Sequence, residues 1–470
     1  MFGTSFYRTV ATIALLVSTA NANEAVGVHG SGTTNPSKCY WAIMEQIEAR
    51  TKADTHLTYR AVGSTTGIAE FVNDYDTTEP VNDFGSGDLP LNNTVWTRFN
   101  STGVKVLQFP VLLGAVSFFH SVKYVDKLDL NACLLARIFR RDIKEWTHPD
   151  IVAFNPELAD VPVDEDMSII VAHRVRGSSS TSSITNYLNV ACPDEWSDDL
   201  VGSRITWPDD TKGCEGSGGM TDCINNDPNV IGYIDAGHGI AEGLSEIELE
   251  NKDGTLLSSQ EASARGGIAA AEQGALPDSV EADFSGVSLL NRPGEYTWPI
   301  VLMTYVYVRQ DMTYFDDAAE ASLTVAFLEA LYNDDYIQQC ADNYGFTLPT
   351  SDVRDMAEEG IKSLILPDGA PKWTFESSTD PIDGHGEYVI SGKRQRISDI
   401  ERDSLMSSSA TKEELEQEIA ALKAELNDKA GMTDKQERQL MAALVLSCMC
   451  FVYLIIFSIF PLLRCFSRKE

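Results

Sequence analysis

Basic side chains are scarce in this sequence. Its 470 residues include 36 Lys and Arg but 70 Asp and Glu, which gives a formal net charge of −34 at pH 7. A chain with this charge repels nucleic acid and other polyanions over most of its surface. We therefore exclude nucleic acid as a partner, and we expect any bound anion to be held by local structure.

The sequence also lacks the short motifs of several enzyme classes. It has no Gly-x-Ser-x-Gly nucleophile elbow and no Ser-His-Asp spacing, so acyl hydrolysis is a poor fit. No lysine follows the glycines of residues 29–36, as a nucleotide-binding P-loop would require. No Cys-x-x-Cys pair or His/Cys cluster indicates a zinc site. We expect a protein that is not an enzyme and that uses no cofactor or metal.

Apolar runs occur at both ends of the chain. Residues 9–22 follow one arginine and end on small residues, which is typical of a signal peptide over 1–22. Residues 440–463 carry no formal charge and exceed the ~20 apolar residues that span a bilayer, so they predict a transmembrane helix. Basic residues follow in the tail, 464–470, which places that tail in the cytoplasm. The sequence predicts a single-pass type I membrane protein whose main domain is extracellular or lumenal.

The cysteines before the membrane span fit an oxidising compartment, where they form disulfides. Cys214 and Cys223 lie in a Gly-rich excursion over 208–225, and their short separation predicts that they pair with each other. Three arrangements stay open for the other four, Cys39, Cys133, Cys192 and Cys340. Asn92 and Asn100 begin sequons for N-glycosylation, which we expect to be used in a secreted domain.

Strand-like and helical segments alternate from residue 25 to about residue 350. Runs rich in β-branched and aromatic residues predict strands over 56–62, 104–113, 115–122, 167–175, 229–235 and 299–309. The spacing of apolar residues predicts helices over 36–51, 130–139 and 316–333. This alternation indicates α/β domains with largely parallel sheets. Residues 367–408 lack a core pattern and predict a linker, and 409–438 predict a helical or short coiled-coil stalk.

Four polar stretches together predict an anion site. Residues 28–41, 61–71 and 171–188 each contain a small-residue turn that leads into a helical pattern, and residues 82–91 contain Asp88. The first N–H groups of a helix have no partner within it, so such an end binds anions through backbone donors, hydroxyls and the helix dipole. Each Ser or Thr alone is more often a helix cap. The combination of the four stretches indicates a cage for a small tetrahedral oxyanion.

The order of these stretches resembles a known family, the periplasmic phosphate-binding proteins of the bacterial high-affinity phosphate ABC transporter. Gly-x-Gly-x-Thr, Gly-Ser-Thr/Ser-x-Gly, Asp-Phe-Gly-x-x-Asp and Arg-x-x-Gly-Ser occur in that order, within a similarity from residue 27 to about 345. The resemblance implies an α/β, two-lobed periplasmic-binding-protein fold with a hinge and a central cleft, in an ectodomain over 23–366. Lobe 1 would comprise about 25–112 plus 297–366, and lobe 2 about 113–296.

The resemblance also implies which side chains hold phosphate. Arg174 would be the ion-pairing donor, and Asp88 would accept a hydrogen bond from the protonated anion. The hydroxyl and amide donors would be those at the three helix ends, Thr34, Asn35, Ser64, Ser178, Ser179 and Ser180. Three positions depart from the family pattern: Asn35 stands where Phe is usual, Ser180 stands where Thr is usual, and Arg176 stands where an Asp commonly orients the arginine.

These observations predict membrane-anchored, extracellular binding of inorganic phosphate in an inter-lobe cleft, for uptake or sensing. The expected partners are phosphate, the lipid bilayer and a phosphate transporter. One alternative is a binder of another oxyanion such as sulfate, arsenate or molybdate, although Asp88 disfavours an anion without a proton. A phosphatase-type enzyme would need a nucleophile or a two-metal carboxylate cluster that the sequence does not indicate. An adhesion ectodomain without a working site is favoured only by Asn35 and Arg176.

Overall fold

The structure of the protein, a computed structural model, describes residues 25–72, 82–125, 127–379 and 384–396. The predicted signal peptide, stalk, membrane span and tail lie outside these residues. Among the helices of the described part, none is long and apolar enough to cross a membrane. The described residues up to Gln395 belong to one compact unit.

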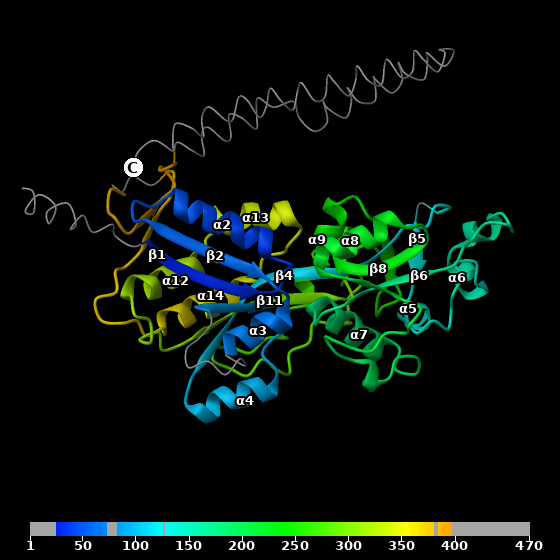
Figure 1. Ribbon diagram of the computed structural model, residues 1–470, viewed down its shortest axis with the longest axis horizontal. Helices are drawn as coiled ribbons and strands as arrows, with labels where there is room; N and C mark the ends of the chain where they lie inside the picture. Colours follow the sequence, from blue (N-terminus) through cyan, green and yellow to red (C-terminus); the bar gives the residue numbers. More distant parts are fainter. Residues whose placement is uncertain (1–24, 73–81, 126, 380–383, 397–470) are drawn as a thin grey trace, which may run out of the picture. The chain divides into compact units, whose positions relative to one another are not determined.

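Two lobes share one long strand, β4 (Val106–His120), whose residues are all buried. The strand pairs antiparallel with β11 (Val301–Arg309) over Val106–Ala115 and with β8 (Val230–Asp235) over the remaining residues. Two separate strands were expected on either side of Gly114. The backbone of Gly114 is not in the left-handed region, so the strand continues through it and passes from one lobe to the other (Figure 1).

The first lobe is built on a sheet in the order β2-β1-β3-β11-β4. Its other elements are β1 (Val26–Gly32), α2 (Ser37–Ala49), β2 (Thr55–Ala61), α3 (Ser64–Val72), β3 (Phe84–Gly87), α4 (Asn93–Thr102), α12 (Ala318–Ala330), α13 (Asp334–Tyr344) and α14 (Ser351–Lys362). Strand β1 pairs parallel with both β2 and β3. The turns that follow these three strands therefore lie at the same edge of the sheet.

The second lobe continues the sheet in the order β4-β8-β6-β7, and β9 pairs with β4, β5 and β10. Its other elements are β5 (Leu128–Leu130), α5 (Ala132–Phe139), α6 (Pro149–Phe154), the 3₁₀ helix η1 (Pro156–Asp160), β6 (Ile170–Arg174), α7 (Ser179–Ala191), η2 (Asp198–Leu200), β7 (Lys212–Cys214), α8 (Gly216–Asn226), α9 (Ala236–Ala241), β9 (Ser245–Glu250), β10 (Leu256–Leu257), α10 (Ser259–Ala264) and α11 (Gly267–Ala270). The Gly-rich excursion expected over 208–225 contains β7 and most of α8. Met220 and Ile224 are buried one helical turn apart, and this packing holds the glycine-containing helix together.

Three disulfides fasten helices to their lobes. Cys39–Cys340 joins α2 to α13, which lie side by side in Figure 1, and Cys133–Cys192 joins α5 to the end of α7. The third disulfide joins Cys214 in β7 to Cys223 in α8, with the two Cα atoms 6.5 Å apart. The structure thus selects one of the three arrangements that stayed open for the first four cysteines.

Part of the segment predicted as a linker is folded onto the first lobe. β12 (Thr374–Glu376) and β13 (Val389–Ser391) pair in parallel. Trp373 and Ile390 are buried in the core of that lobe, with 4% and 0% of their surface exposed. The linker prediction is wrong for these residues, because a few apolar side chains suffice when a segment docks on an existing core instead of forming its own.

Candidate anion-binding site

Three helices begin at the point where the two lobes meet. Helix α2 follows β1, α3 follows β2, and α7 follows β6 on the second lobe. A Cβ atom at Gly63, before α3, would lie 3.2 Å from the carbonyl oxygen of Gly177, before α7. The two turns therefore contact each other across the lobes. The positive end of each helix dipole lies at such a turn, which favours a bound anion there.

Side-chain hydrogen bonds join the lobes at this point. Ser179 Oγ on α7 donates to Asp88 Oδ2, which follows β3, over 2.8 Å. Thr65 Oγ1 on α3 donates to Ser203 Oγ over 3.3 Å. Each pair takes one residue from each lobe, so the lobes are closed on one another in this structure.

Asp88 is a buried acceptor, with 2% of its surface exposed. Its Oδ2 accepts from Ser179, from Thr33 Oγ1 and from Asn35 Nδ2, the last over 2.9 Å. Its Oδ1 accepts from Thr304 Oγ1 over 2.7 Å. Burial raises the pKa of Asp88, and these four hydrogen bonds act against that rise by stabilising the charged form. Oδ1, with a single donor, retains room for one more hydrogen bond.

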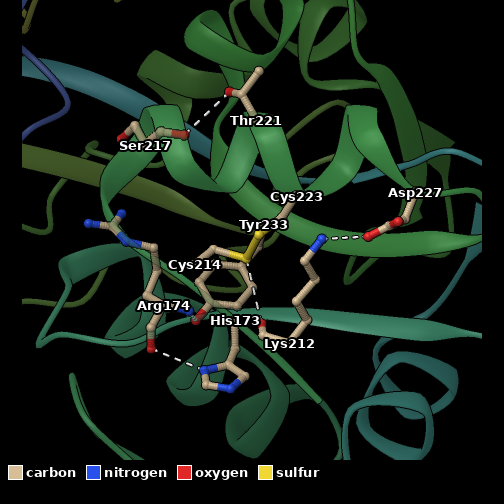
Figure 2. The surroundings of a disulfide bond; sticks show 9 residues. All are labelled: His173, Arg174, Lys212, Cys214, Ser217, Thr221, Cys223, Asp227 and Tyr233. Carbon is tan, nitrogen blue, oxygen red and sulfur yellow. Dashed lines mark hydrogen bonds and ion pairs between the residues drawn. A yellow bond between two sulfur atoms is a disulfide. The ribbon is translucent and has the colours of Figure 1, made fainter. Parts of the chain in front are cut away.

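Arg174 is a buried cation at the end of β6. Only 6% of its surface is exposed, and its Nε has no hydrogen-bond partner among the described residues. Burial lowers the pKa of Arg174, while Tyr233, Asp88 and Glu215 act in the opposite direction. Figure 2 shows its side chain extending toward the start of α8, past the Cys214–Cys223 disulfide. Arginine stays charged in proteins, and no acidic side chain of the described residues forms an ion pair with this guanidinium, although Asp88 and Glu215 lie near enough to act on its pKa.

Hydroxyl groups surround the same helix ends. Ser64 begins α3 with 3% of its surface exposed, and its Oγ has no partner within the described residues. Ser178 caps α7 without a side-chain cap bond, and Ser180 is 1% exposed on the first turn. Thr34 Oγ1 lies 3.1 Å from Ser217 Oγ at the start of α8. The helix ends thus combine unpartnered or rotatable hydroxyl donors.

The predicted site residues fall into two groups. Asn35 and Ser179 bind Asp88 directly, whereas Thr34, Ser64, Ser178, Ser180 and Arg174 lie at the surrounding helix and strand ends. The departure at position 176 has a structural counterpart. Arg176 Nε forms an ion pair of 2.8 Å with Glu215, and both side chains are about two-thirds exposed (66% and 67%). Arg176 therefore points to solvent and does not orient Arg174.

Sequence reasoning missed three residues of this region. Thr33 and Thr304 donate to Asp88, and Ser217 contacts Thr34. Thr33 adjoins a predicted residue and could have been included with it. Thr304 lies inside β11, far from the polar stretches in sequence, and a threonine within a strand pattern carries no sign of such a role.

The arrangement is suited to binding a small, partly protonated oxyanion. Its donors are hydroxyls, helix N-termini and one guanidinium, and its buried carboxylate, Asp88, can accept a hydrogen bond from a protonated ligand. The predicted glycosylation residues lie elsewhere on the first lobe. Asn92 and Asn100 are both exposed, and Asn92 Oδ1 accepts from the Val95 backbone N–H at the start of α4.

Curated relatives of the chain include two proteins described as "Phosphate-binding protein PstS". The one from Methanocaldococcus jannaschii is 29% identical over 291 residues, which cover 60% of this chain and 72% of the relative. The one from Haemophilus influenzae is 27% identical over 320 residues, which cover 67% of this chain and 87% of the relative.

Solved structures show the same fold. A phosphate-binding protein from Stenotrophomonas maltophilia has a TM-score of 0.55 at 19% identity, covering 71% of this chain and 94% of that protein. A human phosphate-binding apolipoprotein has a TM-score of 0.56 at 17% identity, covering 71% of this chain and 93% of that protein. At these identities the likeness concerns the fold alone.

A family model described as "PBP superfamily domain" matches residues 17–334, which is more than half of the chain. The match covers the second lobe and the part of the first lobe up to residue 334, and it includes the shared strand β4 and the three helix starts described above. The curated relatives are PstS-type proteins, in agreement with the resemblance seen in the sequence. The chain therefore belongs to the PBP superfamily.

Proposed function

We propose that the protein binds inorganic phosphate in the cleft between its two lobes, for uptake or sensing outside the cell. The side chains proposed to hold the anion are those at the helix and strand ends of the cleft, Thr34, Asn35, Ser64, Asp88, Arg174, Ser178, Ser179 and Ser180. The curated relatives named above are phosphate-binding proteins, which supports this choice of ligand.

The observation that carries the proposal is the buried guanidinium of Arg174, which forms no ion pair with the described residues. A buried cation without a partner costs several kcal/mol, so proteins seldom keep one without a use. Arg174 lies in a chain with a net charge of −34, where acidic side chains are plentiful, yet none of the described ones forms an ion pair with it. A phosphate dianion or monoanion would supply the missing counter-charge and accept hydrogen bonds from the guanidinium.

Asp88 gives the site its preference for a protonated anion. Phosphate near neutral pH carries at least one proton and can donate a hydrogen bond to the free position on Asp88 Oδ1. Sulfate carries none, and closing the lobes over it would bury two like charges without a hydrogen bond between them. Phosphate is therefore favoured over sulfate by the acceptor, and over a neutral ligand by Arg174.

The curated relatives are described as phosphate-binding proteins, and we propose that this chain likewise binds phosphate without catalysing a reaction. The apolar run at 440–463 supports a membrane anchor, and the signal-like start supports an extracellular or lumenal cleft. A phosphate transporter is the proposed partner.

Calorimetric titration of the purified protein with phosphate, sulfate, arsenate and molybdate tests the ligand. We expect phosphate to bind most tightly, with sulfate much weaker. Tighter binding of molybdate or sulfate would show that the ligand is another oxyanion and not phosphate. Absence of binding to all four would favour an ectodomain that has lost its site.

A further inference from the structure

A hydroxyl of the second lobe contacts one of the proposed anion ligands of the first. Ser217 is the second residue of α8, and its Oγ lies 3.1 Å from Oγ1 of Thr34, in the turn before α2. Both side chains are half-buried, so neither hydroxyl is sealed in the core. Figure 2 shows Ser217 at the start of α8, on the side toward which Arg174 extends. Ser217 thus contacts one proposed ligand and lies near another.

The structure around the start of α8 holds Ser217 in place. Gly216 precedes it with a φ of +67°, in the left-handed region that favours glycine. Cys214, at the end of β7, pairs in register with Arg174 of β6 and forms a disulfide with Cys223 of α8. The start of α8 is therefore tied on both sides to the strand that carries Arg174. A hydroxyl fixed in this way can act on a neighbouring ligand with a defined geometry.

The direction of the bond between the two hydroxyls matters for the anion. Each hydroxyl has one proton, and either atom of the pair can be the donor. If Thr34 donated to Ser217, its proton would be used within the protein and could not reach an anion. If Ser217 donates, Thr34 keeps its proton for the ligand. The positive end of the α8 dipole lies at Ser217 and favours donation by its hydroxyl, and a bound anion attracts the proton of Thr34.

We propose that Ser217 is a positioning residue of the anion site, whose hydroxyl donates to Thr34 Oγ1 and so directs the Thr34 proton to the anion. The two residues come from different lobes, so the bond forms only when the lobes close. Closure therefore improves a donor of the site in addition to surrounding the ligand, and bound phosphate in turn stabilises closure. This role rests on the proposed function and deepens it.

Calorimetric phosphate titrations of the full-length protein test the role with Ser217→Ala, Thr34→Val and the double variant. We expect Ser217→Ala to weaken phosphate binding roughly two- to tenfold, the value of one hydrogen bond, and Thr34→Val to weaken it at least as much. The Ser217 substitution should add little in the Thr34→Val background, because its effect passes through Thr34. Ser217→Thr keeps the hydroxyl and should bind more tightly than Ser217→Ala. Losses that multiply in the double variant, or no loss in either single variant, would overturn the proposal.

Ser203→Ala is the matched control. It removes the same group from the other hydroxyl pair that joins the lobes, Thr65 with Ser203, and neither residue is a proposed anion ligand. Its phosphate Kd should change by less than about twofold, since this pair is exposed to water. An equal loss in Ser203→Ala and Ser217→Ala would show that Ser217 acts only by joining the lobes, which would overturn its positioning role.

Thermal unfolding without phosphate separates this role from a structural one. Ser217→Ala should unfold at the same temperature as the wild-type protein, because its effect requires the anion. A lower unfolding temperature together with an unchanged phosphate Kd would refute the role and leave the proposed function intact. Absence of phosphate binding by the wild-type protein would refute the proposed function, and the role of Ser217 with it.

Discussion

Asp88 and Arg174 are both buried where the two lobes meet, but they differ in the partners that the described residues offer them. Asp88 accepts hydrogen bonds from four neutral donors on both lobes. Arg174 has no ion pair within the described residues, and its Nε has no partner. The carboxylate is thus held in place by the protein, whereas the described residues supply no ion-pair partner for the guanidinium, which we propose binds the anion. We therefore expect substitutions of the two residues to have different effects on anion binding.

Replacing Asp88 by Asn should narrow the preference for phosphate over sulfate. The amide oxygen can keep the three donors at the Oδ2 position, and its NH₂ group can donate to Thr304 Oγ1 or to either anion. An unsatisfied buried acceptor costs about 1–3 kcal/mol, so the wild-type preference from this source is roughly five- to more than a hundredfold. Calorimetric titration of both anions at fixed pH and salt measures the change.

Asp210→Asn is a matched control for that experiment. It removes the same charge from a carboxylate that is 48% exposed and pairs with Arg141 and Lys144 on the second lobe. Its phosphate-to-sulfate ratio should equal that of the wild-type protein. An unchanged ratio in Asp88→Asn would show that Asp88 is not the discriminating group.

Replacing Arg174 by Ala should weaken phosphate and sulfate together, by a factor on the order of a hundred or more, because both need the same buried cation. The ligand-free protein should not lose stability and should gain some, since an unpaired buried charge is removed. Calorimetry and thermal unfolding measure the two effects. Arg176→Ala is the control, because its ion pair with Glu215 is exposed and contributes little. Retained affinity in Arg174→Ala would refute the role of this residue.

At the level of elements, the sequence predicts most of the fold that positions the site. The six predicted strands and three predicted helices are all present near their expected bounds, apart from the two strands that merge into β4. The spacing of apolar residues and the content of β-branched and aromatic residues are enough to predict such segments, because each segment buries a continuous face. The link between Thr304 and Asp88 could not be predicted, since it depends on β11 returning beside β3 from over two hundred residues away.

The folded segment that ends the described chain was also missed, for a related reason. Trp373 packs against Tyr388 with ring centroids 5.3 Å apart, and its Nε1 donates to Ser322 Oγ on α12 over 3.2 Å. The Ser391 backbone N–H donates to the Arg50 carbonyl over 3.0 Å. All these contacts are made with the first lobe or within the segment, so a pattern search within the segment finds no core.

Trp373→Ala should therefore destabilise the first lobe or release this segment from it, at a cost of about 3–5 kcal/mol for a buried aromatic residue. Denaturant unfolding and limited proteolysis between residues 367 and 396 measure the loss. Trp373→Phe keeps much of the buried area and should lose less. Phosphate affinity should be unchanged, because none of these contacts involves the cleft. Wild-type stability and protease resistance in Trp373→Ala would show that docking of this segment does not stabilise the first lobe.

At the level of the whole molecule, the apolar ends predict an orientation that lies outside the described residues. Protease added to intact cells, or to sealed right-side-out vesicles, should remove the phosphate-binding domain and spare the tail at 464–470. The physical reason is the basic charge that follows the apolar run, which favours the cytoplasmic side. An antibody to each end distinguishes the fragments. Survival of the binding domain together with loss of the tail would show that the orientation is the opposite of the predicted one.

Closure of the two lobes over one anion is the central claim, and a crystal structure of the protein saturated with phosphate tests it most directly. We predict a tetrahedral anion between the lobes, with the Arg174 guanidinium and the N-terminal groups of α3 and α7 at about 2.7–3.1 Å from its oxygens. One phosphate oxygen should lie about 2.5–2.7 Å from Asp88 Oδ1, the distance of a charge-assisted O–H···O hydrogen bond. A phosphate bound elsewhere, or a cleft in which Arg174 contacts no anion oxygen, would contradict the account.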